Sequence, residues 1–173
     1  GPMQTGDVYF DDLGVPSAVF EGIAPFARRL TPDNLRGLLA PRRRSAHKGS
    51  FGHVLIVGGD RGMPGAVRLA GEAALRSGAG LVTLATHTAH APTINAGRPE
   101  LIAFGVSGSA DLAPLLARAR VVAIGPGLQR NSWGGKLFTA ALEARRPLVV
   151  DADALHWLAQ EPAQYDSWVL TPH

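Results

Sequence analysis

Residues 54–78 read VLIVGGDRGMPGAVRLAGEAALRSG and place an apolar run, a glycine-rich loop and an alanine-rich segment one after another. Val54–Val57 has no polar interruption, which is typical of a parallel strand covered on both faces. Ala66–Arg76 has the composition of a helix, and Ser77-Gly78 supplies its C-terminal stop. The stretch therefore predicts a strand, a tight loop and a helix, which is the repeating unit of an α/β sheet.

The same unit recurs along the chain. Five more apolar runs predict strands: Leu81–Ala85, Leu101–Phe104, Val121–Ile124, Leu148–Val150 and Trp168–Leu170. Further helices are expected, with Ser132 and Asp153 as N-caps of the last two, over Ala110–Ala119, Ser132–Ala144 and Ala154–Ala159. Alternating strands and helices imply right-handed crossovers and a doubly wound α/β sheet.

The N-terminal part of the chain has a different pattern. Gly6–Pro16 alternates enough to predict a short strand with a Gly/Pro stop, and a linker-like stretch continues to Leu30. Thr31 and Pro32 are typical of a helix N-cap and a first helical residue, so a helix is expected from there to about Leu39.

Composition limits the class of protein. A chain of 173 residues with 46% apolar and 18% charged residues has room for one domain with a real core. It contains no cysteine, which excludes disulfides, thiolate chemistry and cysteine-based zinc sites. No apolar stretch approaches the roughly 20 residues that span a bilayer, and no charged-then-apolar signal segment opens the chain. We expect a cytoplasmic protein with no membrane partner.

The net charge of +3 comes partly from Arg42–Arg44, with His47 and Lys48 close behind. Such a run can bind nucleic acid or phosphate, or it can be a solvated linker. The linker interpretation is favoured, because no aromatic residues interleave with the basic ones as they do in single-strand binding platforms. We expect no nucleic-acid partner.

Small, polar and acidic residues follow five of the predicted strands. They are Gly58-Gly59-Asp60, Thr86-His87, Gly125-Pro126-Gly127, Asp151-Ala152-Asp153 and Thr171-Pro172-His173. In a doubly wound sheet, ligands bind beyond the carboxyl ends of the strands, so these residues should converge on one edge. A binding site is therefore predicted at that edge.

The glycine motifs leave two interpretations open. The loop at residues 58–65 is not a dinucleotide fingerprint, because Asp60 occupies the second glycine position. It is not a Walker A loop either, because no Gly-Lys-Ser/Thr sequence follows. Gly59 and Gly125 can contact a phosphate, or they can form tight strand-to-helix turns.

Acidic and histidine residues supply the other candidates at this edge. Asp151 and Asp153 share one face if the strand continues, where they can hold a magnesium-bound water or a ribose hydroxyl. Helix capping also accounts for Asp153, so Asp151 is the stronger candidate. His87 and His90 lack a third ligand nearby, so no metal site is expected there. His173 ends a strand at the predicted edge and should hydrogen-bond the substrate.

Eight segments share their order and spacing with one enzyme family: Lys48–Gly52, Val54–Gly59, Gly65–Ala70, Ala73–Val82, Arg98–Leu101, Ile124–Leu128, Asp151–Leu155 and Thr171–His173. Over these segments the chain resembles the ADP/ATP-dependent NAD(P)H-hydrate dehydratase family, the C-terminal half of bifunctional NAD(P)H-hydrate repair enzymes. The resemblance implies a ribokinase-like, three-layer αβα fold with a mostly parallel central sheet, incomplete at the C-terminus. It also implies two parts: residues 1–30, the tail of a preceding epimerase-like domain plus a linker, and residues 31–173, the N-terminal portion of the dehydratase domain.

The activity that this resemblance implies is the repair of hydrated NADH or NADPH. The family uses ADP or ATP, with Mg²⁺, to phosphorylate the ring hydroxyl, and loss of phosphate then restores the ring. Its substrate contacts fall on the positions of Ala66, Gly127 and His173, and homo-oligomers are expected. Its catalytic aspartate lies in a later Gly-Thr-Gly-Asp loop. We therefore expect no catalytic residue in this chain and no turnover from it alone.

Two positions depart from the pattern of the family that the chain resembles. Two functions other than the dehydratase also stay open. Gln129 stands where many relatives have glycine and should reshape the phosphate side, whereas His156 replaces a usual asparagine and should affect helix packing. The alternatives are a small-molecule kinase with the same fold and a non-catalytic nucleotide-binding module. Competition by a reduced dinucleotide would distinguish the dehydratase from the kinase, and binding without turnover would favour the module.

Overall fold

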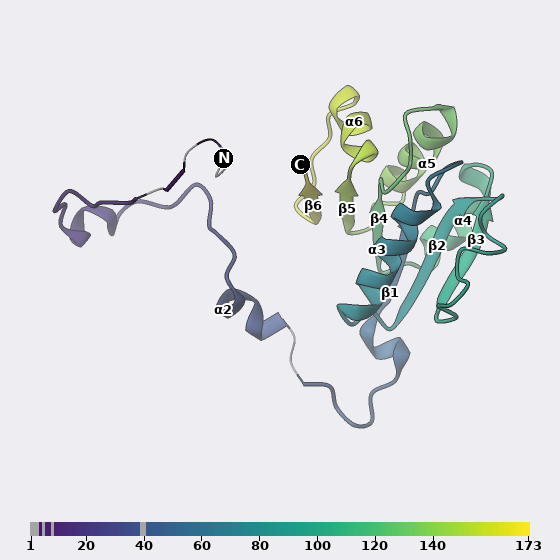
Figure 1. Ribbon diagram of the computed structural model, residues 1–173, viewed down its shortest axis with the longest axis horizontal. Helices are drawn as coiled ribbons and strands as arrows, with labels where there is room; N and C mark the ends of the chain where they lie inside the picture. Colours follow the sequence, from purple (N-terminus) through teal and green to yellow (C-terminus); the bar gives the residue numbers. More distant parts are fainter. Residues whose placement is uncertain (1–3, 5, 8, 39–40) are drawn as a thin grey trace. The chain divides into compact units, whose positions relative to one another are not determined.

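The computed structural model describes residue 4, residues 6–7, residues 9–38 and residues 41–173 (Figure 1). The chain divides into two compact units, Gly1–Arg43 and Arg44–His173, which are described separately. None of the helices in the described part of the chain is long and apolar enough to cross a bilayer.

The second unit is built on a sheet of six strands in the order β3-β2-β1-β4-β5-β6. All five strand pairings are parallel. The strands are β1 (His53–Val57), β2 (Leu81–His87), β3 (Leu101–Val106), β4 (Val121–Ile124), β5 (Leu148–Asp151) and β6 (Trp168–Thr171). Each contains the strand that the sequence predicts and extends it by two residues at most.

Helices cover both faces of this sheet. The helices are α3 (Pro64–Arg76), α4 (Ser109–Arg118), α5 (Ser132–Glu143) and α6 (Asp153–Gln160). Successive residues of β1 point to opposite faces: Ile56 packs with Val67 of α3, whereas Leu55 and Val57 join the cluster that contains residues of α4, α5 and α6. Figure 1 shows α3 crossing in front of the strands. The predicted three-layer, doubly wound architecture is confirmed.

The predicted N-caps of two helices are wrong. Asn131, not Ser132, caps α5, and its Oδ1 accepts hydrogen bonds from Trp133 N at 3.1 Å and Gly134 N at 3.0 Å. Asp153 is the first residue of α6 rather than its cap, and the N-cap position is occupied by Ala152. Both errors arise because the chain enters each helix one residue earlier than the composition indicates.

The first unit contains only short helices among its described residues. A 3₁₀ helix covers Ser17–Phe20, and α2 (Pro32–Leu35) continues as a 3₁₀ helix over Arg36–Leu38. Thr31 caps α2 as predicted, since Asn34 Oδ1 accepts from Thr31 N at 3.0 Å and from Thr31 Oγ1 at 2.8 Å. The predicted C-terminal limit near Leu39 lies outside the described residues.

The strand predicted at the start of the first unit is wrong. In the described residues of this segment, the carboxylates of Asp11 and Asp12 accept hydrogen bonds from Leu13 N at 2.7 Å and Gly14 N at 2.9 Å. These contacts close a turn in place of a strand. A short strand also needs a neighbouring strand for its backbone groups. Val8 lies outside the described residues.

Gly125→Ala should strongly destabilise the second unit. Gly125 has φ +127°, and a Cβ there would collide with the backbone oxygen of Asp151. We expect a loss of more than about 3 kcal/mol in the free energy of unfolding, measured by urea denaturation. Gly65→Ala is the matched control: its φ is ordinary and no atom lies within 4 Å of the added Cβ, so the change should be below about 0.5 kcal/mol. Equal stabilities for the two variants would contradict this packing.

His53 should make the stability of the second unit sensitive to pH. Burial removes the ring from water and lowers the pKa of His53, while its Nε2 lies 2.8 Å from Thr83 Oγ1. As the pH falls through about 6.5, the unfolded chain takes up a proton that the folded chain resists, so folding stability should fall. Urea denaturation at pH 7.5 and pH 5.5 should show a smaller decline for His53→Gln than for the unchanged protein. The stability of the exposed His47→Gln variant should fall between these pH values as much as that of the unchanged protein. If its stability did not change with pH, the effect could not be assigned to His53.

Candidate functional site

The strand order reverses between β1 and β4. The chain leaves β1 towards α3 on one face and leaves β4 towards α5 on the other, which is the arrangement in which doubly wound sheets bind ligands in a crevice between the two loops. The loops are joined below it by backbone hydrogen bonds, from Gly59 N to Pro126 O at 2.9 Å and from Asp60 N to Gly127 O at 2.8 Å. The predicted convergence of these strand ends is therefore present in the structure.

Close packing of the two loops requires several of their glycines. A Cβ at Gly58 would collide with the oxygen of Pro126, and one at Gly59 would collide with Val67 of α3. Gly59 and Gly125 also have positive φ values of +66° and +127°. These contacts favour the tight-turn interpretation for Gly59 and Gly125. Phosphate contact by either residue stays a prediction.

Ala66 and Gly127 are brought together across the crevice. A Cβ at Gly127, which has φ +61°, would lie 3.3 Å from Cβ of Ala66 and 2.8 Å from Cβ of Met63. Gly127 is buried and Ala66 is half-buried at the start of α3. Gly127 has to be small because Met63 and Ala66 pack directly against it.

Asp60, which the sequence places at the binding edge without a role of its own, is a central residue of the structure. Its side chain is 4% exposed and accepts two hydrogen bonds, from Arg61 N at 2.7 Å and from Asn131 Nδ2 at 2.6 Å. Because Asn131 also caps α5, Asp60 ties the loop after β1 to the start of that helix. An asparagine directly before a helical segment is a cap signal that could have identified Asn131.

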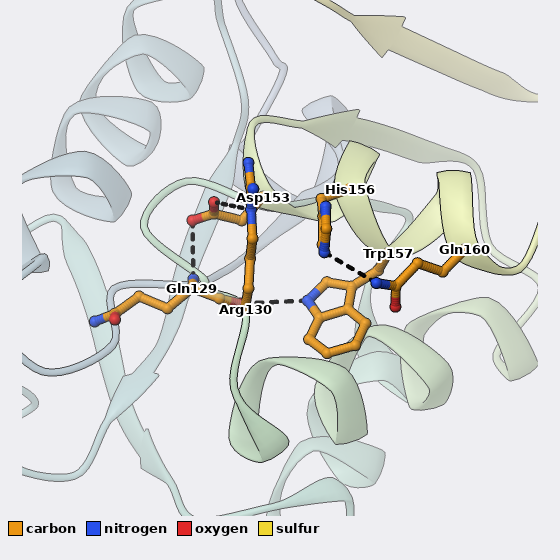
Figure 2. Close-up of polar contacts among 6 residues, drawn as sticks. All are labelled: Gln129, Arg130, Asp153, His156, Trp157 and Gln160. Atoms are coloured by element: carbon orange, nitrogen blue, oxygen red, sulfur yellow. Dashed lines mark hydrogen bonds and ion pairs between the residues drawn. The ribbon is translucent and has the colours of Figure 1, made fainter.

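A second polar cluster joins the loop after β4 to α6 (Figure 2). Asp153 Oδ2 accepts from Gln129 N at 2.9 Å, and its Oδ1 lies 3.6 Å from Nε of Arg130. Trp157 Nε1 donates to the backbone oxygen of Gln129 at 3.2 Å. Asp153 thus holds the neighbouring loop in place. His156 bonds to Gln160 within α6 at 3.1 Å.

Gln129 occupies a left-handed conformation with φ +59°. Glycine adopts this conformation without strain, which agrees with the glycine that the family resemblance implies at this position. The side chain of Gln129 reaches across the crevice, where its Nε2 donates to Arg61 O at 2.9 Å. This bond adds a third link between the loops.

Asp151 and Asp153 do not share one face, contrary to the sequence prediction. Ala152 between them has φ +43°, which turns the chain sharply after β5. Asp151 Oδ1 therefore accepts from Thr171 Oγ1 on β6 at 2.7 Å, away from the partners of Asp153. His173 follows Thr171 at the same edge and is exposed.

The described residues do not form a magnesium site by themselves. Nowhere in this part of the chain do three histidine, cysteine or acidic side chains come close enough together to bind a metal ion. The carboxylate of Asp153 is already paired with Gln129 and Arg130, and that of Asp151 with Thr171. A groove of about 550 Å³ between α4 and α5 contains none of the predicted site residues.

Comparison with known proteins identifies similar chains. The family model described as NAD(P)H-hydrate dehydratase matches residues 54–173. The bifunctional NAD(P)H-hydrate repair enzyme of Coxiella burnetii is 48% identical over 172 residues, which are 99% of this chain and 35% of that enzyme. This chain thus spans about a third of that relative's length.

Two solved structures share the fold. One is a ribokinase-like superfamily protein from Enterococcus faecalis, with a TM-score of 0.76, 29% identity, and coverage of 83% of this chain and 53% of that one. The other is the ADP/ATP-dependent NAD(P)H-hydrate dehydratase of Bacillus subtilis co-crystallised with ATP and Mg²⁺. It gives a TM-score of 0.64, 30% identity, and coverage of 81% of this chain and 50% of that one.

Gln129→Gly should be more stable than Gln129→Ala. Both variants lose the bond to Arg61, but only glycine relieves the left-handed backbone at φ +59°. We expect a difference of about 1 kcal/mol in the free energy of unfolding, measured by urea denaturation. If the alanine variant is the more stable one, residue 129 does not adopt this conformation in solution.

Proposed function

The chain belongs to the NAD(P)H-hydrate dehydratase family, and we propose that the whole protein restores hydrated NADH and NADPH by nucleotide-dependent dehydration. Its relatives are NAD(P)H-hydrate repair enzymes, and one family model matches more than two thirds of the chain. The activity is proposed for the whole protein because this chain spans 35% of the Coxiella burnetii enzyme.

The juxtaposition of Ala66 and Gly127 at the crevice carries this proposal. Both residues are small and lie where the strand order reverses, which is where doubly wound sheets bind their ligands. The N-terminus of α3 beside Ala66 adds N–H groups that favour a negatively charged ligand. His173, exposed on the same edge, is positioned to offer a ring nitrogen to the substrate.

The residues of this chain act by binding and orientation in the proposed reaction. Phosphorylation of the ring hydroxyl needs a base and a nucleoside phosphate, ADP or ATP, and we assign no base to this chain. The interlocked loops hold Ala66 and Gly127 at a fixed separation, which fixes the orientation of the ring for that chemistry. Mg²⁺ is proposed to accompany the nucleotide, and no step is assigned to it because the described residues supply no set of ligands.

Cellular location and assembly are part of the same proposal. A cytoplasmic location suits a substrate that arises from the soluble nicotinamide pool, and the family resemblance implies a homo-oligomer. Size-exclusion chromatography with light scattering on the full-length protein measures the assembly directly.

Ala66→Leu should impair the full-length protein at the substrate step. We expect restoration of the reduced nicotinamide absorbance from its hydrate, with ADP or ATP, by the full-length protein and none by the 173-residue chain alone. A leucine at position 66 would fill the crevice and raise KM for the hydrate about tenfold or more. Ala73→Leu, exposed on the same helix, is the control and should leave KM unchanged.

Circular dichroism should show both variants folded. Two results would count against the proposal: no turnover by the folded full-length protein with either nucleotide, or equal KM values for the two leucine variants.

A further inference from the structure

Arg61 and His87 meet at the carboxyl edge beside the crevice. Arg61 lies in the loop after β1, and His87 is the last residue of β2. Their side chains approach with Arg61 Nε 3.3 Å from His87 Nε2. Their backbones are held on both sides, because His87 N donates to Gly59 O at 3.2 Å and Gln129 Nε2 donates to Arg61 O at 2.9 Å. The pair is thus fixed against the same loops that form the crevice.

The two ring nitrogens of His87 both face N–H donors. Arg61 Nε lies at Nε2, and the backbone N–H of Ala89 lies 3.2 Å from Nδ1. A neutral imidazole carries one N–H and can accept at one nitrogen only, whereas arginine stays protonated. The two contacts therefore need different tautomers, and in the one that keeps the contact to the fixed backbone of Ala89, Nδ1 accepts and Nε2 carries the proton.

This tautomer leaves two N–H donors directed at the same space. His87 Nε2–H and the guanidinium of Arg61 then lie 3.3 Å apart without an acceptor between them. Arg61 is exposed and has a long side chain, so its guanidinium can turn and share one acceptor with His87. A phosphate oxygen suits both donors, since arginine and imidazole N–H groups form short charge-assisted bonds to it.

The surroundings leave room for such a group. A Cβ at Gly62, the residue after Arg61, would have no atom within 4 Å, and the same holds for Gly65 at the start of α3. Behind the pair, the ring of Trp133 lies 6.0 Å from that of His87 and limits its rotation. Nε2 of His90, whose ring is 6.1 Å from that of His87, is buried without a partner among the described residues.

We propose that Arg61 and His87 form a phosphate-binding subsite for the dinucleotide substrate. The identity of the ligand rests on the proposed function, because the pair lies next to the crevice of Ala66 and Gly127. A dinucleotide placed with its ring in that crevice can extend a phosphate group across the loop after β1 to this pair. The subsite therefore contributes to affinity for the substrate and takes no part in the chemical step.

The test uses the full-length protein and the variant Arg61→Gln. We expect KM for the hydrated dinucleotide to rise about tenfold, with kcat within about twofold and KM for ADP unchanged. Arg61→Lys should recover part of the affinity, because it keeps the charge. Arg76→Gln, at the far end of α3 on the opposite edge of the sheet, is the matched control and should leave KM unchanged.

Comparing hydrated NADH with hydrated NADPH shows which phosphate group of the substrate binds to Arg61 and His87. A KM increase for hydrated NADPH alone assigns the 2′-phosphate, and an equal increase for both hydrates assigns the pyrophosphate. An active Arg61→Gln protein with unchanged KM would overturn the subsite, as would an increase in KM for ADP alone.

A binding measurement separates this inference from the proposed function. Isothermal titration calorimetry with inorganic pyrophosphate should show binding to the unchanged full-length protein and about tenfold weaker binding to Arg61→Gln. If turnover is absent but pyrophosphate binding depends on Arg61, the anion subsite stands and the dehydratase proposal fails. If turnover is present but neither pyrophosphate binding nor KM for either hydrate depends on Arg61, the dehydratase proposal stands and the subsite fails.

Discussion

Two backbone hydrogen bonds between the loops after β1 and β4 are the interaction on which the rest of the carboxyl edge depends. Gly59 and Asp60 donate to the oxygens of Pro126 and Gly127, which brings the loops closer than any side chain would allow. The crevice of a doubly wound sheet lies where the strand order reverses, here between β1 and β4. Its opposing small residues, Ala66 and Gly127, can face each other only while the contact holds.

The carboxylates of Asp60 and Asp153 reinforce the contact between the two loops. Asp60 connects the first loop to the cap of α5, and Asp153 fixes the backbone of the second loop beside α6. Asp60 is buried and accepts two hydrogen bonds, so any movement would leave its charge unpaired. Asp153 is partly exposed and combines one hydrogen bond with an ion pair to Arg130. These two aspartates therefore act on the geometry of the rim, and the residues that face a ligand are small or exposed.

The sequence predicted the sheet well because continuous apolar runs such as Val54–Val57 allow few structures other than buried parallel strands. It also placed Gly127 and His173 after strands that end at one edge, whereas Ala66 came from the family resemblance. Local patterns could not predict contacts between distant segments, such as Asp60 with Asn131 or Arg61 with His87. The cap at Asn131 had a local signal, whereas Ala152 takes the N-cap position of α6 because the chain turns sharply there, with φ +43°.

The order of the strands also affects how the site forms during synthesis. β1 and its glycine loop leave the ribosome before the carbonyl groups of Pro126 and Gly127, which follow after two helices and three strands. β2 can pair with β1 as soon as it is made, but the loop contact that completes the site cannot form until β4 has been made. Parallel sheets of this kind fold through such non-local contacts, so the nascent chain carries an open, glycine-rich loop for that interval. The binding edge is consequently a late feature of a sheet whose central strand is made first.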